Sequence, residues 1–267
     1  MSTDRQSSLV NITELENGIF KIILSDPSHQ NTLSEKMIDE LQSVFDQFNS
    51  SPSRVIIFSS TGKVFSAGHD LKELKAARSH PDKGKEYFQS ILKKCSRLMQ
   101  TIVNHSKPVI AQVDGVATAA GCQLALSCDL VYASSNSRFA TPGVNIGLFC
   151  STPMVALSRN TTSKHSMEML LTGELISADD AEKKGLINKS VNEEELENLI
   201  LEKATKISSK SGTTLKIGKK AFYQQIEMPL AEAYDYASKV MLENMLDQDA
   251  KEGIEAFLEK RSPNWKE

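Results

Sequence analysis

The chain has 267 residues, and its 31 Lys and Arg against 34 Asp and Glu leave a net charge of −3. A chain of this length can bury a sizeable core without disulfides or metals. A nearly balanced charge provides no field that would hold nucleic acid or an anionic membrane, so neither is expected as a partner. With 40% hydrophobic and 24% charged residues, the composition excludes wholesale disorder and fibrous chains.

The cysteines and the N-terminal residues bear on the cellular compartment. The four cysteines show no paired spacing and no histidine at ligand spacing, so neither a zinc site nor a disulfide framework is predicted. Residues 1–18 contain an early acid and no apolar run, and they resemble neither a secretory signal nor a transit peptide. The longest apolar stretch, residues 109–133, is interrupted by polar residues that a lipid core would not accept. We therefore expect a cytoplasmic location, no membrane partner and no metal.

The first two thirds of the chain alternate short β-branched stretches with helical patterns, which is typical of strand–helix–strand units in a mostly buried sheet. Strands are predicted at residues 19–24, 55–60, 109–113 and 130–133. Between the first two strands, apolar residues recur on one face of a helix that Ser34 caps, with Glu35 in its first turn. A second helix is predicted from apolar positions between 87 and 102, and Lys107-Pro108 ends it.

The last third is predicted to be helical. Residues 177–180 have the pattern of a helix cap, and Gly185 closes the short helix that follows. After Glu193 no strand is expected. The tail carries an apolar stripe that a small helical segment cannot bury against itself, so we expect it to pack on a neighbouring subunit; a core within the chain is the alternative. The stripe consists of Tyr234, Ala237, Val240, Met241, Met245, Ile254, Phe257 and Leu258.

Two glycine-centred turns follow predicted strands, at residues 65–71 (FSAGHDL) and 115–123 (GVATAAGCQ). Where a strand gives way to a helix, the first N–H groups of the helix have no intrahelical acceptor and can bind developing negative charge. Each turn could thus supply half of an oxyanion hole. The alternative is that small residues only allow helix and strand to approach closely.

Three segments resemble the enoyl-CoA hydratase/isomerase family, the crotonases. Residues 65–74 resemble the family's first oxyanion and adenine-binding loop, residues 107–115 resemble the strand leading to the second, and residues 252–265 are similar to its closing helix. The resemblance implies an α/β fold with a crotonase-like ββα spiral core, residues 1–200, and a C-terminal helical trimerisation region, residues 201–267. It also implies an acyl-CoA thioester as ligand, a homotrimer or dimer of trimers, and no cofactor besides the coenzyme A of the substrate.

The resemblance assigns the two oxyanion-binding N–H groups, by position, to His69 and Ala120. Gln123 and Gly143 stand where the family's hydratases carry two glutamates. An amide cannot exchange a proton near neutral pH and glycine brings no group, so ordinary water addition lacks both of its proton carriers.

A narrower resemblance, to the family's methylmalonyl-CoA decarboxylase branch, rests on the histidine after Gly68 and on residues 143–147 (GVNIG). Loss of CO₂ from a malonyl-type thioester needs an oxyanion hole but no carboxylate base. The tyrosine that this branch places a few residues further corresponds to Cys150. We therefore expect decarboxylation or isomerisation. A non-catalytic acyl-CoA-binding or regulatory protein and an atypical hydratase are the alternatives.

The predicted site follows from these matches. The candidate catalytic residues are His69, Ala120, Gln123 and Cys150. The candidate substrate-binding residues are Ala67, Gly68, Asp70, Leu71, Lys72, Gly121, Gly143 and Lys260. Each side chain also has a structural interpretation: a histidine that faces solvent or CoA, a packed thiol at 150, a satisfied buried amide at 123, and exposed lysines.

Overall fold

Three successive ββα turns form the core of the computed structural model, which describes residues 8–266. In each turn the first strand joins a large sheet, the second joins a small sheet, and a helical segment follows. The strand pairs are β3 (Val55–Ser60) with β4 (Val64–Ser66), β5 (Val109–Val113) with β6 (Val116–Thr118), and β7 (Leu130–Ser134) with β8 (Arg138–Ala140). The predicted ββα spiral is confirmed.

The large sheet has the strand order β1-β2-β3-β5-β7-β10, and the small sheet has the order β4-β6-β8-β9. β1 (Val10–Glu14) runs antiparallel to β2 (Ile19–Leu24), while the other neighbours in the large sheet are parallel. β9 (Ile176–Ser177) and β10 (Lys189–Val191) lie at the sheet edges. The four predicted strands are confirmed as β2, β3, β5 and β7. Most of the others have two or three residues, too few to show a periodic pattern.

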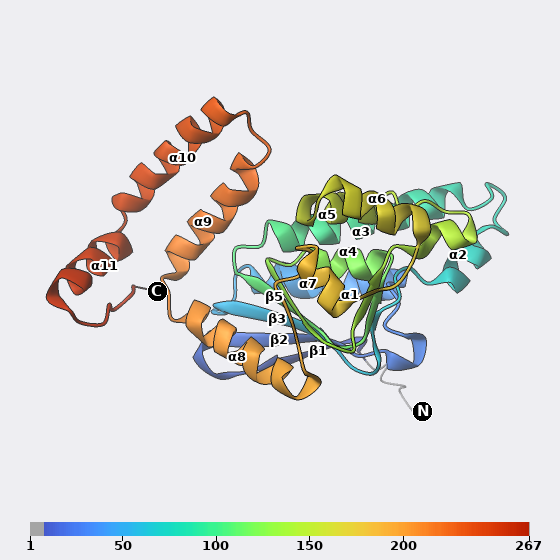
Figure 1. Ribbon diagram of the computed structural model, residues 1–267, viewed down its shortest axis with the longest axis horizontal. Coiled ribbons are helices and arrows are strands. Elements are labelled where there is room, and N and C mark those ends of the chain that lie inside the picture. The colour runs from blue at the N-terminus through green and yellow to red at the C-terminus, as the bar shows by residue number, and fades with distance from the viewer. Residues whose placement is uncertain (1–7, 267) are drawn as a thin grey trace, which may run out of the picture.

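Helices cover both faces of the large sheet (Figure 1). α1 (Glu35–Phe48) begins as predicted at Ser34, whose hydroxyl accepts the Met37 N–H, and α3 (Lys85–Val103) ends as predicted before Lys107. α8 (Glu193–Ser208) covers the opposite face. The remaining helical segments of the core are η1 (Glu16–Gly18), η2 (Pro27–His29), α2 (Leu71–Ala77), α4 (Ala120–Leu126), η3 (Pro142–Ile146), α5 (Pro153–Asn160), α6 (Ser163–Thr172) and α7 (Ala178–Lys183).

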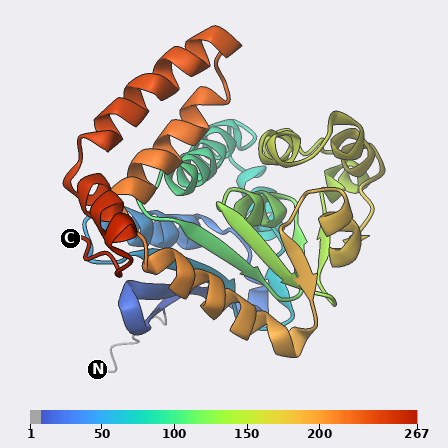
Figure 2. The same ribbon diagram turned by 60° about the vertical axis from the view of Figure 1, so that its left-hand side comes forward.

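A C-terminal arm, residues 212–266, extends from this core (Figures 1 and 2). It contains α9 (Gly212–Gln225), α10 (Leu230–Met245) and α11 (Gln248–Glu259). Side chains of the apolar stripe are exposed in the single chain: Phe257 is 84% exposed and Met241 59%. The alternative of a core within the chain is therefore wrong. The division expected at residue 200 falls inside α8, which packs on the sheet.

Other features of the described residues concern membranes, metals and thiols. No helix between residues 8 and 266 has the length and apolar character needed to cross a bilayer. In the same range, no group of three or more His, Cys, Asp or Glu side chains is placed to hold a metal ion. All four cysteines are free and buried.

His105 lies buried beneath α1 as a neutral imidazole. Its Nε2 lies 3.1 Å from the Phe45 carbonyl oxygen, and its Nδ1 accepts the Lys107 N–H at 3.1 Å. One ring nitrogen must therefore donate while the other accepts. Burial, together with the nearby charge of Lys219, lowers the pKa of His105 to about 4.

We expect this histidine to make the protein less stable in acid. As the pH falls below the unfolded pKa of about 6.5, the unfolded chain takes up the proton first, so the free energy of unfolding decreases by up to about 3 kcal/mol between pH 7 and pH 4. Urea unfolding at several pH values measures this slope. His105→Gln keeps a donor and an acceptor but does not titrate, and it should flatten the slope; equal slopes in the two proteins contradict the assignment.

Candidate active site

The two glycine-centred turns lie side by side at one edge of the small sheet. β4 and β6 pair in parallel, so their carboxyl ends lead into α2 and α4 at the same edge. A Cβ placed on Gly68 would lie 3.0 Å from the Ala120 nitrogen, and one placed on Gly121 would lie 2.1 Å from the Ser66 carbonyl oxygen. The turns therefore touch, and neither glycine has room for a side chain.

Each turn carries an unpaired main-chain donor. Among residues 8–266, the N–H groups of His69 and Ala120 have no hydrogen-bond acceptor. The N–H groups that precede them are paired: the Ala67 N–H donates to the Gln30 carbonyl oxygen at 3.1 Å, the Gly68 N–H to the Ser66 hydroxyl at 3.3 Å, and the Ala119 N–H to the Ala140 carbonyl oxygen at 3.0 Å. Ala120 is the first residue of α4, where an N–H lacks an intrahelical acceptor. Two free donors on touching turns suit a single developing oxyanion.

The His69 side chain points into the protein rather than into solvent. Its Nδ1 lies 3.4 Å from the Leu33 carbonyl oxygen, and its Nε2 is shielded from solvent without a partner in the described structure. Burial lowers the pKa of His69, so the ring is neutral at neutral pH. With Nδ1 donating to Leu33, Nε2 carries a free lone pair. The interpretation of His69 as a solvent-facing side chain is therefore wrong.

Two further buried polar side chains lie beside Ala119. Gln123, one helical turn along α4, is 6% exposed, and its Oε1 has no partner within the described residues. Thr141 follows Ala140, whose carbonyl oxygen accepts the Ala119 N–H at 3.0 Å; its own hydroxyl is also shielded and unpaired. Unpaired buried polar atoms are rare in native proteins. Thr141 could not be recognised from the sequence, because a hydroxyl before Pro142 carries no distinctive pattern. The expectation of a satisfied amide at Gln123 is wrong.

Gly143 is the second residue of η3, and Cys150 lies in the loop that follows η3. The Gly143 N–H lies 3.3 Å from Cys150 Sγ. A Cβ on Gly143 would lie 2.5 Å from the Leu148 carbonyl oxygen and 2.8 Å from Cys150 Sγ, so no side chain fits there. Burial raises the pKa of the Cys150 thiol, which therefore stays protonated at neutral pH.

The predicted CoA-contacting residues fall into two separate groups. Asp70 caps α2 by accepting the Lys72 N–H at 2.7 Å, and Leu71 is 56% exposed beside the exposed Lys72. Lys260 instead terminates α11, at the opposite end of the molecule from α2 (Figure 1). Within one chain, Lys260 therefore does not lie near the two turns of the candidate site, because the arm extends away from the core.

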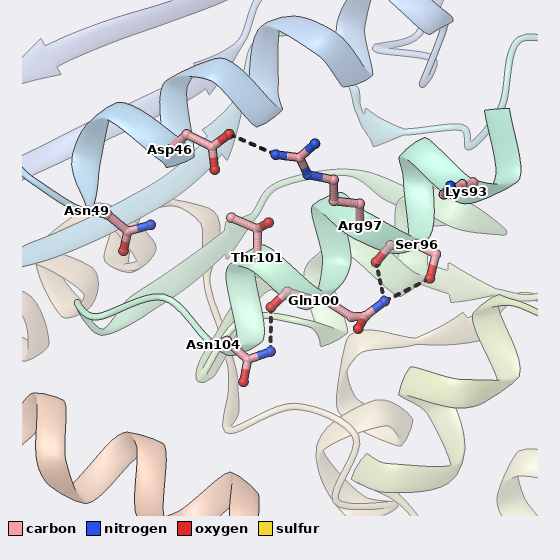
Figure 3. A pocket seen from close by; sticks show the side chains of 8 residues that line it. All are labelled: Asp46, Asn49, Lys93, Ser96, Arg97, Gln100, Thr101 and Asn104. Atoms are coloured by element: carbon pink, nitrogen blue, oxygen red, sulfur yellow. Dashed lines mark hydrogen bonds and ion pairs between the residues drawn. The ribbon is translucent and has the colours of Figure 1, made fainter. Parts of the chain in front are cut away.

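A separate hollow of about 580 Å³ lies between α1 and α3 (Figure 3). The residues that line it are polar or charged, and several of them pair with one another: Arg97 lies 3.5 Å from Asp46, and Gln100 donates to Ser96. None of the predicted site residues lines it. This hollow is therefore distinct from the candidate active site.

Ala119, the N-cap of α4 directly before Ala120, has a strained backbone with φ 49° and ψ −122°. Such a conformation costs a non-glycine residue about 1–3 kcal/mol. We expect Ala119→Gly to raise the free energy of unfolding by about 1 kcal/mol, the relief being offset in part by the greater freedom of glycine when unfolded. Urea unfolding is the measurement. Ala117→Gly, in β6, is the control and should lower stability; a loss of the same size at both positions contradicts strain at Ala119.

The sequence of this chain matches the family described as "Enoyl-CoA hydratase/isomerase" over residues 14–267. The chain belongs to this family. A mouse member named "Enoyl-CoA hydratase domain-containing protein 3, mitochondrial" is 49% identical, over 95% of this chain and 83% of the relative. The crystal structure of the human enoyl-CoA hydratase domain-containing protein 3 is 47% identical, has a TM-score of 0.91 and covers 96% of this chain and 100% of its own. A structure titled enoyl-CoA hydratase from Mycobacterium smegmatis is 43% identical, with a TM-score of 0.93 and coverages of 97% and 99%.

These relatives confirm the crotonase fold and correct one expectation. Relatives from mouse, rat, frog, human and zebrafish are all named mitochondrial. Their names contradict the cytoplasmic location predicted for this family member. That prediction rested on the composition of the N-terminal residues, and the lack of a recognisable pattern there is not a positive signal for any compartment.

Proposed function

We propose that this family member binds an acyl-CoA thioester with its carbonyl oxygen between the N–H groups of His69 and Ala120. The site would stabilise the thioester enolate for decarboxylation or isomerisation. The observation that carries the proposal is that both N–H groups are unpaired and lie on turns that touch. Preorganised donors in a site shielded from water lower the energy of an oxyanion by several kcal/mol.

The side chains around the oxyanion pair suit loss of CO₂ better than addition of water. Gln123 and Gly143 supply no carboxylate, and no side chain fits at Gly143. In decarboxylation, the bond between the α-carbon and the carboxylate breaks, and its electron pair moves to the thioester oxygen between the two donors. We assign Cys150 as the acid that protonates the α-carbon, because its raised pKa keeps the thiol protonated. The thiolate then regains a proton from water.

The remaining predicted residues bind the CoA portion in this proposal. Ala67, Gly68, Asp70, Leu71 and Lys72 form the wall of the first turn. Lys260 would come from a neighbouring copy, because in its own chain it lies at the far end of the arm. The exposed apolar stripe of the arm supports assembly into a homotrimer or a dimer of trimers, since monomers rarely expose so large an apolar face.

A screen of CoA thioesters by mass spectrometry tests the proposal. Malonyl-, methylmalonyl-, 3-enoyl- and crotonyl-CoA are incubated with the protein, and the products are separated by chromatography. Loss of CO₂ or migration of the double bond is the expected result, and loss of CO₂ should require Cys150 when Cys150→Ala is compared. Gain of water by crotonyl-CoA would indicate an atypical hydratase. Binding of thioesters without turnover would indicate a non-catalytic acyl-CoA-binding protein.

A further inference from the structure

A buried polar cluster ties the C-terminal arm to the core. Lys219 of α9 places its Nζ 2.7 Å from Asp129 Oδ2 and also donates to the carbonyl oxygens of Ile102 and Lys107, at 3.2 and 3.1 Å. The Tyr223 hydroxyl donates to Asp129 Oδ1 at 3.0 Å. The Lys219 side chain is only 8% exposed, although no residue of α9 is fully buried. Polar contacts therefore contribute much of the attachment of α9.

Asp129 links this attachment to α4. It lies between Ser127, which ends α4, and the first residue of β7. Its Oδ2 accepts the Val109 N–H at 2.7 Å, and its own N–H donates to the Val109 carbonyl oxygen at 2.9 Å. The carboxylate thus joins the arm to the start of β5, and the chain connects it to the carboxyl end of α4 two residues earlier.

α4 is packed too tightly to absorb a displacement. All seven of its residues are buried, and its Gly121 meets the Ser66 carbonyl with no room for a methyl group. Close-packed interiors transmit strain instead of deforming locally. A movement at the Asp129 end of α4 is therefore expected to reach Ala120 at the other end.

We propose that Asp129 is a positioning residue, which couples the attachment of the C-terminal arm to the placement of the Ala120 N–H group. The arm also carries the exposed apolar stripe, so contact with a second copy would hold α9 on Asp129 and thereby favour binding of the thioester. Only the expected effect on thioester binding rests on the proposed function. The local mobility of α4 reports on the coupling without any ligand.

Lys219→Met in the full chain tests the coupling, with Lys220→Met as the matched control, because Lys220 is the next lysine of α9 and is exposed. Hydrogen exchange of peptides from α4 and from β3 is followed by mass spectrometry. We expect exchange in α4 to rise about tenfold in Lys219→Met, with β3 unchanged, and the affinity for butyryl-CoA to fall by a similar factor. Lys220→Met should match the wild type in all three measurements.

A second variant separates coupling from misfolding. Lys219→Met leaves the Asp129 carboxylate without its cation, whereas Asp129→Asn combined with Lys219→Met removes both charges and is the variant expected to fold normally. The double variant should still show faster exchange in α4 than Lys220→Met. Equal exchange in α4 for the double variant and Lys220→Met overturns the coupling. Failure of the wild type to bind butyryl-CoA counts against the proposed function, while the exchange comparison still decides the coupling.

Discussion

Replacing Gly121 by alanine is expected to destabilise the protein by about 3 kcal/mol and to abolish binding of CoA thioesters. The added methyl group would lie 2.1 Å from the Ser66 carbonyl oxygen and 2.6 Å from the Ser66 carbonyl carbon. Both atoms belong to the backbone of the other turn, so relief requires the two turns to separate. Urea unfolding followed by far-ultraviolet circular dichroism measures the loss of stability, and calorimetry with butyryl-CoA measures the loss of binding.

Gly218→Ala is the matched control for this substitution. Gly218 also lies within a helix, α9, but a Cβ there meets nothing within 4 Å. The substitution should therefore raise the free energy of unfolding by about 0.5–1 kcal/mol, the usual gain for alanine over glycine in a helix. A Gly121→Ala protein as stable as the wild type would show that the two turns do not meet as described.

Ala120→Pro is expected to lower the rate of the catalysed reaction by about 10²- to 10³-fold. Proline has no N–H, so the substitution removes one of the two proposed oxyanion donors and changes only a methyl side chain. Ala120 is the first residue of α4, a position at which proline does not interrupt helical hydrogen bonds. The preceding Ala119, at φ 49° and ψ −122°, would clash through its Cβ with a following proline, so the substitution is made together with Ala119→Gly and is compared with Ala119→Gly alone. The measurement is kcat/KM for the thioester that the mass-spectrometry screen identifies.

Glu193→Pro provides the control for proline at the start of a helix. Glu193 is the exposed first residue of α8, and the preceding Asn192 has φ −58° and ψ 146°, which a following proline accepts. This variant should keep full activity. If Ala120→Pro has the native circular dichroism spectrum and also keeps full activity, the Ala120 N–H does not stabilise the transition state.

The central strands and the first helices could be predicted because their patterns are local. Ser34 with its apolar successors predicts α1, and the β-branched stretch at β3 predicts a strand buried on both faces. The short strands β4, β6 and β8 could not be predicted, since three residues show no period. The pairing of β4 with β6 nevertheless forms the candidate site, because it brings the two glycine-centred turns together at one edge of the small sheet.

The site could be predicted only where a backbone role depends on local sequence. Gly68 and Gly121 mark the turns in the sequence, and the resemblance to the crotonase family then assigns the two N–H groups to His69 and Ala120. The environment of Thr141 depends on contacts between residues far apart in sequence. The location of Lys260 depends on the direction in which the arm leaves the core, and no local pattern encodes that direction.

The crowding at Gly143 limits how this site can change. Any larger residue there would overlap the Leu148 carbonyl and the Cys150 sulfur. A glutamate therefore cannot be introduced by one substitution. Acquiring hydratase chemistry through this position would require residues 143–150 to take a different course, so that several replacements would have to occur together. The geometry of a single loop thus keeps an acidic side chain out of this position.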